Sequence, residues 1–355
     1  MALPLRRFSM IGMSECRPAA AARRMVRVIL AVAIAAAAFP AVGAEREING
    51  QEIVNAVVGV TATVPEDARS AVTLGTSRSG SGIVIDDQGL VLTIGYLILE
   101  AHAAAVTDAG GDLVPANLVA YDQNTGFGLL RATKPLGIKP LKLGSSDTLP
   151  KGAPVVVISR GGPGPVFPAQ VVSRREFAGY WEYLLDNAIF TMPPHPQFGG
   201  AALVGTDGRL VGVGSLIVHD AVKDGEPSPG NMFVPVDALK PILNDLIKNG
   251  RHPEPPHPWL GIYANEQGGR LFVVRLAKGG PAEKAGIRAG DVIMGVGGRK
   301  VDGMADFLRK VWAMGQAGVE VPVDVLPLSK GEMQIQSVKV RSLDRYDWLK
   351  LSKGL

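Results

Sequence analysis

The chain has 355 residues, with 37 basic and 33 acidic side chains and a formal net charge of +4. The first 44 residues hold six of the basic groups, one acid and the single cysteine, so the remainder carries 31 basic and 32 acidic groups and a net charge of −1. This balance excludes a nucleic-acid or anionic-membrane surface built on net charge, and the absence of cysteine from that remainder excludes disulfide and thiol chemistry there.

The first 44 residues are organised like an export signal. Three arginines (Arg23, Arg24 and Arg27) precede an apolar run of twelve residues from 28 to 39, and Val42-Gly43-Ala44 places small residues at −3 and −1. That run is shorter than the roughly 20 residues of a membrane span. We therefore predict a signal peptide at 1–44, a periplasmic protein and no membrane span in the mature chain. An uncleaved N-terminal anchor is the alternative.

From residue 50 onward, short apolar runs alternate with Gly, Pro and Asp turns, a pattern typical of antiparallel β structure. The runs fall into two sets, and a mature length of 311 residues suggests two domains. Strands of the first set are expected over 57–64, 83–85, 90–93, 103–107, 113–120 and 129–131. Those of the second set are expected over 154–159, 168–173, 184–191, 201–204 and 210–218. The two sets predict two stacked antiparallel barrels over 50–237.

A connecting helix and a linker are expected over 238–257. Apolar residues at helical spacing predict a helix over 238–249, with Pro241 early enough to be tolerated and Gly250 just after its end. The Pro-rich stretch that follows is a stiff linker. A smaller domain over 258–346 is expected to hold strands over 259–262, 271–276, 290–294, 321–326 and 333–340, a helical turn over 281–286 and an amphipathic helix over 304–314.

The smaller domain resembles a known peptide-binding module. Residues 279–293, GGPAEKAGIRAGDVI, are similar to the core signature of bacterial PDZ domains, and Trp259-Leu260-Gly261-Ile262 is similar to their carboxylate-binding loop. PDZ domains bind a peptide C-terminus as an added strand. The resemblance assigns the peptide site to Leu260, Gly261, Ile262, Phe307 and Val311. The alternative is that these apolar residues only close a small core.

The larger domain resembles the HtrA/Deg-type serine proteases. Residues 80–93 are similar to the opening barrel of that family, and Phe233-Val234-Pro235-Val236 followed by a helix is similar to its exit from the second barrel. The resemblance spans residues 50 to 345. It implies a mainly β chain with a trypsin-like double antiparallel β-barrel, followed by a small α+β PDZ domain. We expect no cofactor.

The family's catalytic residues do not carry over. Tyr96 stands at the histidine position and Gly126 at the aspartate position. The nucleophile position falls on Phe198 when the Gly-Gly pair is aligned, and on Gly199 when the alignment runs backward from Asp207-Gly208. A tyrosine is a poor base near pH 7, because its ordinary pKa is about 10, and a glycine has no side chain. Three losses together predict a pseudoprotease.

We expect this pseudoprotease to bind C-terminal or unfolded peptide segments in protein quality control. Two alternatives to this function remain open. One is an active endopeptidase with a relocated Ser/His pair, for which His102, His195 and Ser215 are candidates. The other is a regulatory subunit that joins active HtrA/Deg-type proteins in a mixed oligomer. The five histidines show no ligand spacing, so we expect no metal site.

Overall fold

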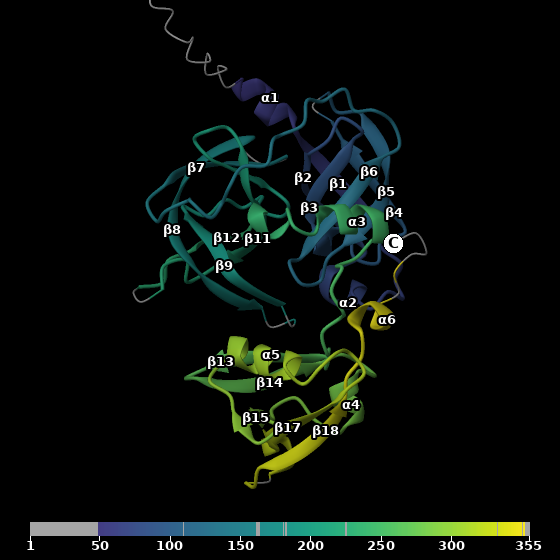
Figure 1. Ribbon diagram of the computed structural model, residues 1–355, viewed down its shortest axis with the longest axis vertical. Helices are drawn as coiled ribbons and strands as arrows, with labels where there is room; N and C mark the ends of the chain where they lie inside the picture. The colour runs from purple at the N-terminus through teal and green to yellow at the C-terminus, as the bar shows by residue number, and fades with distance from the viewer. Residues whose placement is uncertain are drawn as a thin grey trace, which may run out of the picture. The chain divides into compact units, whose positions relative to one another are not determined.

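Two closed β-barrels and a separate six-stranded sheet make up the protein (Figure 1). The computed structural model describes residues 49–351, apart from 109, 161–163, 180, 182, 224–225, 332 and 350. The predicted signal peptide at 1–44 lies outside the described residues. Within the described ranges, no helix has the length and apolar character needed to cross a membrane. The predicted fold class, a mainly β chain with two barrels and a small α+β domain, is confirmed.

The first barrel closes in the strand order β1-β2-β3-β6-β5-β4. Its strands are β1 (Val57–Thr63), β2 (Ser77–Val84), β3 (Leu90–Ile94), β4 (Ala103–Thr107), β5 (Leu113–Tyr121) and β6 (Phe127–Ala132). Two short helices flank β1, namely α1 (Gly50–Asn55) and α2 (Ala71–Leu74). The expected start of the second strand at residue 83 is wrong by six residues, because Ser77 already pairs with Thr63 of β1.

The second barrel closes in the order β10-β11-β12-β9-β8-β7. Its strands are β7 (Pro154–Ile158), β8 (Val166–Gly179), β9 (Tyr183–Met192), β10 (Ala202–Val204), β11 (Leu210–Val218) and β12 (Gly230–Pro235). The hairpin of β8 and β9 extends well past the expected strand end at residue 173. Arg174 and Arg175 interrupt the apolar pattern there, yet their backbones pair with Ile189 and Ala188.

The connection after the second barrel differs from the expected helix over 238–249. A 3-10 turn, η2 (Val236–Ala238), comes first, and the helix α3 covers only Leu243–Asn249. Pro241 separates the two because proline has no N–H to donate within a helix. The predicted end is confirmed: Gly250 has φ +74° and donates its N–H to the carbonyl of Leu246.

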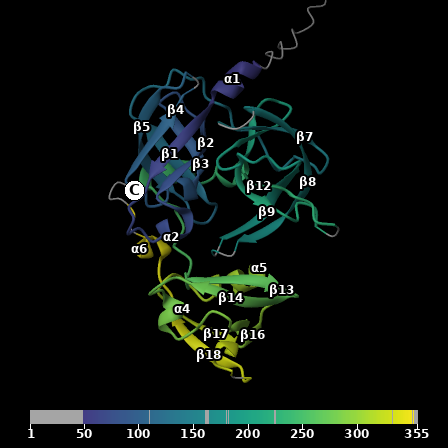
Figure 2. The same cartoon turned by 180° about the vertical axis from the view of Figure 1, so that it is seen from behind.

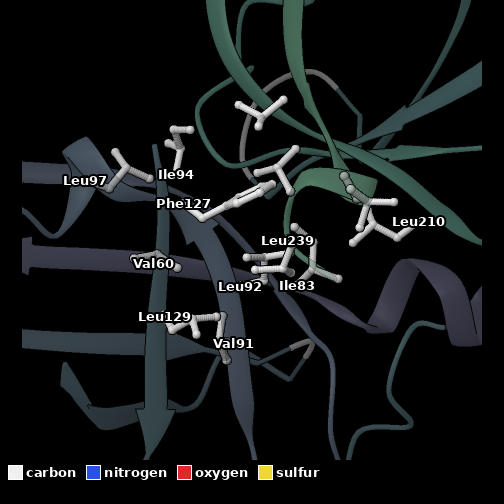
Figure 3. Packing of buried hydrophobic residues seen from close by; sticks show 14 of the residues in the cluster. Val60, Ile83, Val91, Leu92, Ile94, Leu97, Phe127, Leu129, Leu210 and Leu239 are labelled. Carbon is white, nitrogen blue, oxygen red and sulfur yellow. The ribbon is translucent and has the colours of Figure 1, made fainter. Parts of the chain in front are cut away.

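Apolar side chains from both barrels meet in one large buried cluster (Figure 3), and a smaller cluster lies within the second barrel. Buried members from the first barrel include Val60, Ile83, Leu92, Phe127 and Leu129, each at most 1% exposed. Leu210 of β11 and Leu239 after η2 join the same cluster. Burying each such side chain contributes roughly 1.5–3 kcal/mol, so the turns between these strands rest on a rigid scaffold.

The C-terminal sheet has the order β13-β14-β15-β17-β18, with β16 paired to β15. Its strands are β13 (Ile262–Gln267), β14 (Arg270–Leu276), β15 (Val292–Val296), β16 (Arg299–Lys300), β17 (Glu320–Leu326) and β18 (Gln336–Arg341). Three helices accompany it, namely α4 (Pro281–Lys284), α5 (Met304–Trp312) and α6 (Arg345–Trp348), and Figure 2 shows α4 and the strands from behind. The expected strand over 259–262 is wrong, because Trp259 makes only an isolated bridge to Leu343 and β13 begins at Ile262.

Candidate functional site

Tyr96, the residue predicted at the histidine position, lies in the 3-10 turn η1 (Gly95–Leu97) directly after β3. Its hydroxyl donates to the carbonyl of Ser215 in the second barrel, with an oxygen–oxygen distance of 3.0 Å. Burial raises the pKa of the Tyr96 phenol far above its ordinary value. The phenol is therefore neutral and donates its proton to a carbonyl. A general base would instead have to accept a proton.

Gly126, at the predicted aspartate position, adopts φ +80° in the turn before β6. A Cβ added there would lie 3.0 Å from the ring of Tyr183. Tyr183 is buried, donates its hydroxyl to the carbonyl of Thr125 at 2.8 Å, and has a pKa raised well above the ordinary tyrosine value by burial. An aromatic ring thus occupies the space beside Gly126, where a carboxylate side chain would project.

The turn from 196 to 201 places Gly199 opposite Tyr96. A Cβ added to Gly199 would lie 2.9 Å from the Tyr96 hydroxyl oxygen. The carbonyl of Gly199 accepts from the N–H of Ser81 at 2.8 Å, which ties the turn to β2. The neighbouring Phe198 is half-buried, and its carbonyl accepts from the N–H of Ala201 at 3.0 Å.

His195 does form a pair with a serine, but the partner is Ser159 and not the candidate Ser215. The Ser159 hydroxyl oxygen lies 2.8 Å from His195 Nε2, and both side chains are buried. Asn231 fixes the backbone of His195 through both its amide oxygen and its amide nitrogen. Among the described residues, His195 Nδ1 has no hydrogen-bond partner, so no carboxylate orients the ring.

The His195 pair makes stability sensitive to acid. Burial lowers the pKa of His195 below its ordinary value of about 6.5. The unfolded chain therefore binds this proton more tightly, and the free energy of unfolding falls as the pH drops from about 6.5 toward the lower folded pKa. In urea unfolding, His195→Gln should show a shallower loss of stability between about pH 7 and 5 than the parent. Burial also lowers the pKa of His257, but this residue is present in both proteins and so affects both alike. Equal pH dependence of the unfolding free energy in His195→Gln and the parent would therefore contradict the coupling to His195.

A buried ionic cluster beneath Tyr96 was not expected from the sequence. Arg78 of β2 donates to the carbonyls of Tyr96 and Leu99, both at 2.8 Å, and to the hydroxyl of Ser70. The carboxylate of Glu100 accepts from the N–H of Ser70 at 2.7 Å. Burial lowers the pKa of Arg78, while the charge of Glu100 acts in the opposite direction. The cluster holds the Tyr96 backbone and the segment before α2 together.

The five residues predicted to hold a peptide lie at the start of β13 and on α5. Leu260, Ile262, Phe307 and Val311 are at most 2% exposed and pack in the core of the sheet. Gly261 has φ +73°, and an added Cβ would lie 3.0 Å from Ala277. The structure therefore brings the five residues together, with side chains that also serve the core.

No metal centre is formed by the residues that the structure describes. Within the described ranges, no group of three or more His, Cys, Asp and Glu side chains could hold a metal ion. His102 is exposed on the approach to β4, and its ring forms no hydrogen bond with Ser215 or another serine of the described ranges.

Models of two known domains match the chain. Residues 80–213 match the trypsin-like peptidase domain, and residues 258–340 match the PDZ domain. The first match covers β2 to the middle of β11, with Tyr96, Gly126 and Gly199 inside it. The second match covers the C-terminal sheet from β13 to Val340, one residue before the end of β18.

Several bacterial proteases are similar to the chain. Serine protease PepD of Mycobacterium tuberculosis is 29% identical over 283 residues, which cover 73% of this chain and 60% of that protein. Serine protease Do-like HtrA of Bacillus subtilis is 24% identical over 279 residues, or 70% and 61% of the two chains. Periplasmic serine endoprotease DegP of Escherichia coli is 26% identical over 250 residues, or 66% and 52%. The chain thus spans about half to three fifths of the length of these relatives.

Solved structures share the fold. A variant of the HtrA-type protease AlgW with tripeptide aligns with a TM-score of 0.51 and 20% identity over 82% of this chain and 95% of that chain. AlgW with decapeptide aligns with a TM-score of 0.50 and 18% identity over 85% and 98%. The chain thus combines a trypsin-like peptidase domain with a PDZ domain, and HtrA and DegP proteins are among its homologues.

Proposed function

We propose that this chain is a pseudoprotease of the HtrA/Deg family, which binds C-terminal or unfolded peptide segments and does not hydrolyse them. One observation carries the proposal: a Cβ added at residue 199 would lie 2.9 Å from the Tyr96 hydroxyl oxygen, yet this residue is Gly199, which has no side chain to act as a nucleophile. This distance favours Gly199 over Phe198 as the nucleophile position. Acyl transfer needs a nucleophile and a base within hydrogen-bond reach of each other.

The other two positions support the same conclusion. The proton of Tyr96 is directed at the carbonyl of Ser215, and the ring of Tyr183 fills the space beside Gly126. Restoring a serine at residue 199 would therefore leave it without a base, and a histidine at 96 would lack a carboxylate to orient it. All three positions would have to change together, and Tyr183 would have to move.

Hydrolysis is tested on the purified protein with unfolded casein and with a fluorophosphonate probe for reactive serines. We expect no turnover and no labelling by the parent protein or by Gly199→Ser. Ser159→Ala is the matched control. Among the residues that the structure describes, Ser159 is the serine whose hydroxyl lies within hydrogen-bond distance of a histidine ring, that of His195. Turnover that disappears in Ser159→Ala would refute the pseudoprotease proposal and support the alternative of an endopeptidase with relocated residues.

We further propose that peptides bind at the PDZ loop formed by Leu260, Gly261 and Ile262, with α5 as the other wall. The domain match and the position of β13 at one end of the strand order support this. In two-dimensional NMR spectra, a peptide with a free C-terminus should shift the backbone amide signals of these three residues. The same peptide with an amidated C-terminus should shift them much less, because loop N–H groups bind the carboxylate. Shifts confined to other parts of the sheet would refute this site.

A periplasmic location fits this function. The Arg-rich and apolar pattern of residues 1–44 supports export, and a relative of the chain bears the name periplasmic serine endoprotease DegP. Cell fractionation with an antibody against the PDZ domain tests the location. Protein found only in the cytoplasm would refute export.

A further inference from the structure

The structure holds a cavity of about 790 Å³ that none of the five predicted peptide-binding residues lines. Its walls come from the region of Tyr96 and Phe198, from the segment around α2, and from the sheet residues around Tyr263 and Ala277. These segments all belong to the same compact unit of the chain. The volume is in the range of roughly 300–1,000 Å³ that is typical of small-molecule sites.

The walls of this cavity are mainly aromatic and apolar. The aromatic side chains that line it are Tyr96, Tyr121, Trp181, Tyr183, Phe198, Trp259, Tyr263 and Trp348. Two apolar side chains of α2 at its rim are unusually exposed, Val72 at 90% and Leu74 at 38%. Apolar surface of this kind at the mouth of a cavity is typical of a ligand site.

The polar atoms of the inner wall are largely occupied within the protein. The hydroxyl of Tyr96 donates to the carbonyl of Ser215, and the hydroxyl of Tyr183 donates to the carbonyl of Thr125. An extended peptide needs backbone donors and acceptors along its length. This wall therefore suits a hydrocarbon chain better than a peptide backbone.

Positive charge predominates around the cavity. Four cations line it, Arg69, Arg275, Lys278 and Arg345, against the two acids Glu66 and Asp67. Arg69 stacks on the ring of Trp348 at 3.4 Å, and Arg345 donates to the carbonyl of Trp181. Within the described part of the chain, Arg275 and Lys278 form no ion pair. Arg275 lies in β14 and Lys278 lies two residues after its end, and the guanidinium of Arg275 stacks on the ring of Tyr263 at 3.9 Å from the ring centroid.

We propose that this cavity binds an anionic single-chain amphiphile, such as a fatty carboxylate, with its hydrocarbon chain against the aromatic wall and its carboxylate at Arg275 and Lys278. The proposal is independent of the pseudoprotease assignment, because it does not require that hydrolysis be lost. Each added CH₂ of a buried chain should then raise the affinity by about fourfold until the cavity is filled.

The test is calorimetric titration of the purified full chain, without detergent, with octanoate, decanoate and 1-decanol below micelle-forming concentrations. We expect saturable binding that tightens from octanoate to decanoate, and weaker binding of the uncharged decanol. The double variant Arg275→Gln/Lys278→Gln should bind decanoate about tenfold more weakly and decanol unchanged. Both side chains are exposed, so the variant should fold normally. The matched control is Arg299→Gln/Lys300→Gln on β16, outside the cavity lining.

Three results would overturn the proposal. The first is decanoate binding that is absent or not saturable. The second is equal decanoate affinity in the double variant and the parent protein, which would show that the two cations hold no ligand. The third is that a peptide with a free C-terminus binds, that its binding depends on Arg275 and Lys278, and that decanoate does not bind. This result would show that the cavity holds a peptide.

Discussion

Arg78→Met is expected to lower the free energy of unfolding by about 3–5 kcal/mol, the usual cost of breaking a buried ionic cluster by removing one partner. Arg78 is only 5% exposed and donates to three backbone carbonyls, those of Gly75, Tyr96 and Leu99. Without the guanidinium, the partly buried carbonyl of Tyr96 loses this donor, the carbonyl of Leu99 keeps only the Ser70 hydroxyl at 3.5 Å, and Glu100 loses a nearby opposite charge.

The matched control for this prediction is Arg131→Met in the same barrel. Arg131 pairs with Asp86 at 2.7 Å, but both side chains remain partly exposed, so the loss should be no more than about 1 kcal/mol. Urea unfolding monitored by tryptophan fluorescence measures both variants. Equal losses would contradict the role assigned to the buried cluster.

The effect should also reach the cavity above the cluster. Arg78 holds the carbonyl of Tyr96 on one side and the hydroxyl of Ser70 on the other, and both residues line the cavity. An Arg78→Met protein that remains folded at low temperature should therefore bind decanoate less tightly than Arg131→Met does. This links the stability of the first barrel to the proposed ligand site.

Most strands of the barrels could be predicted from the sequence, because apolar alternation and Gly or Asp turns mark them locally. The expected strands over 103–107 and 210–218 coincide with β4 and β11. The pattern failed where tertiary pairing overrides local polarity, as in β8 beyond residue 173, and where Pro241 delays the start of α3. Helices α1 and α6 are too short to leave a periodic signal.

The candidate site was only partly predictable, since its key contacts join residues far apart in the chain. A one-residue ambiguity between Phe198 and Gly199 cannot be resolved by alignment; what the fold adds is that a Cβ on Gly199 would lie 2.9 Å from the Tyr96 hydroxyl. The partner of His195 is Ser159, 36 residues away, and no sequence spacing signals that pair. The contacts of Arg78 are mostly with backbone carbonyls, which every residue type offers.

The turn beside Gly199 gives the second large prediction. Gly200→Ala should lower the free energy of unfolding by about 3 kcal/mol or more, because it combines left-handed backbone strain with a steric clash. Gly200 has φ +73°, and its N–H donates to the carbonyl of Gly214 at 2.8 Å. A Cβ added there would lie 2.0 Å from the carbonyl oxygen of Ser81, a backbone atom that cannot rotate away.

Gly137→Ala separates the two causes of this loss. Gly137 has φ +62°, but an added Cβ would meet nothing within 4 Å, so only strain of about 1–2 kcal/mol is expected. The excess loss in Gly200→Ala, measured by thermal and urea unfolding, then reports the close packing of the turn against β2. Equal losses in the two variants would contradict that packing. A clear excess would explain why a turn that bears no nucleophile still needs glycine at this position: the fold of the two barrels requires it, whatever the chemistry at Gly199.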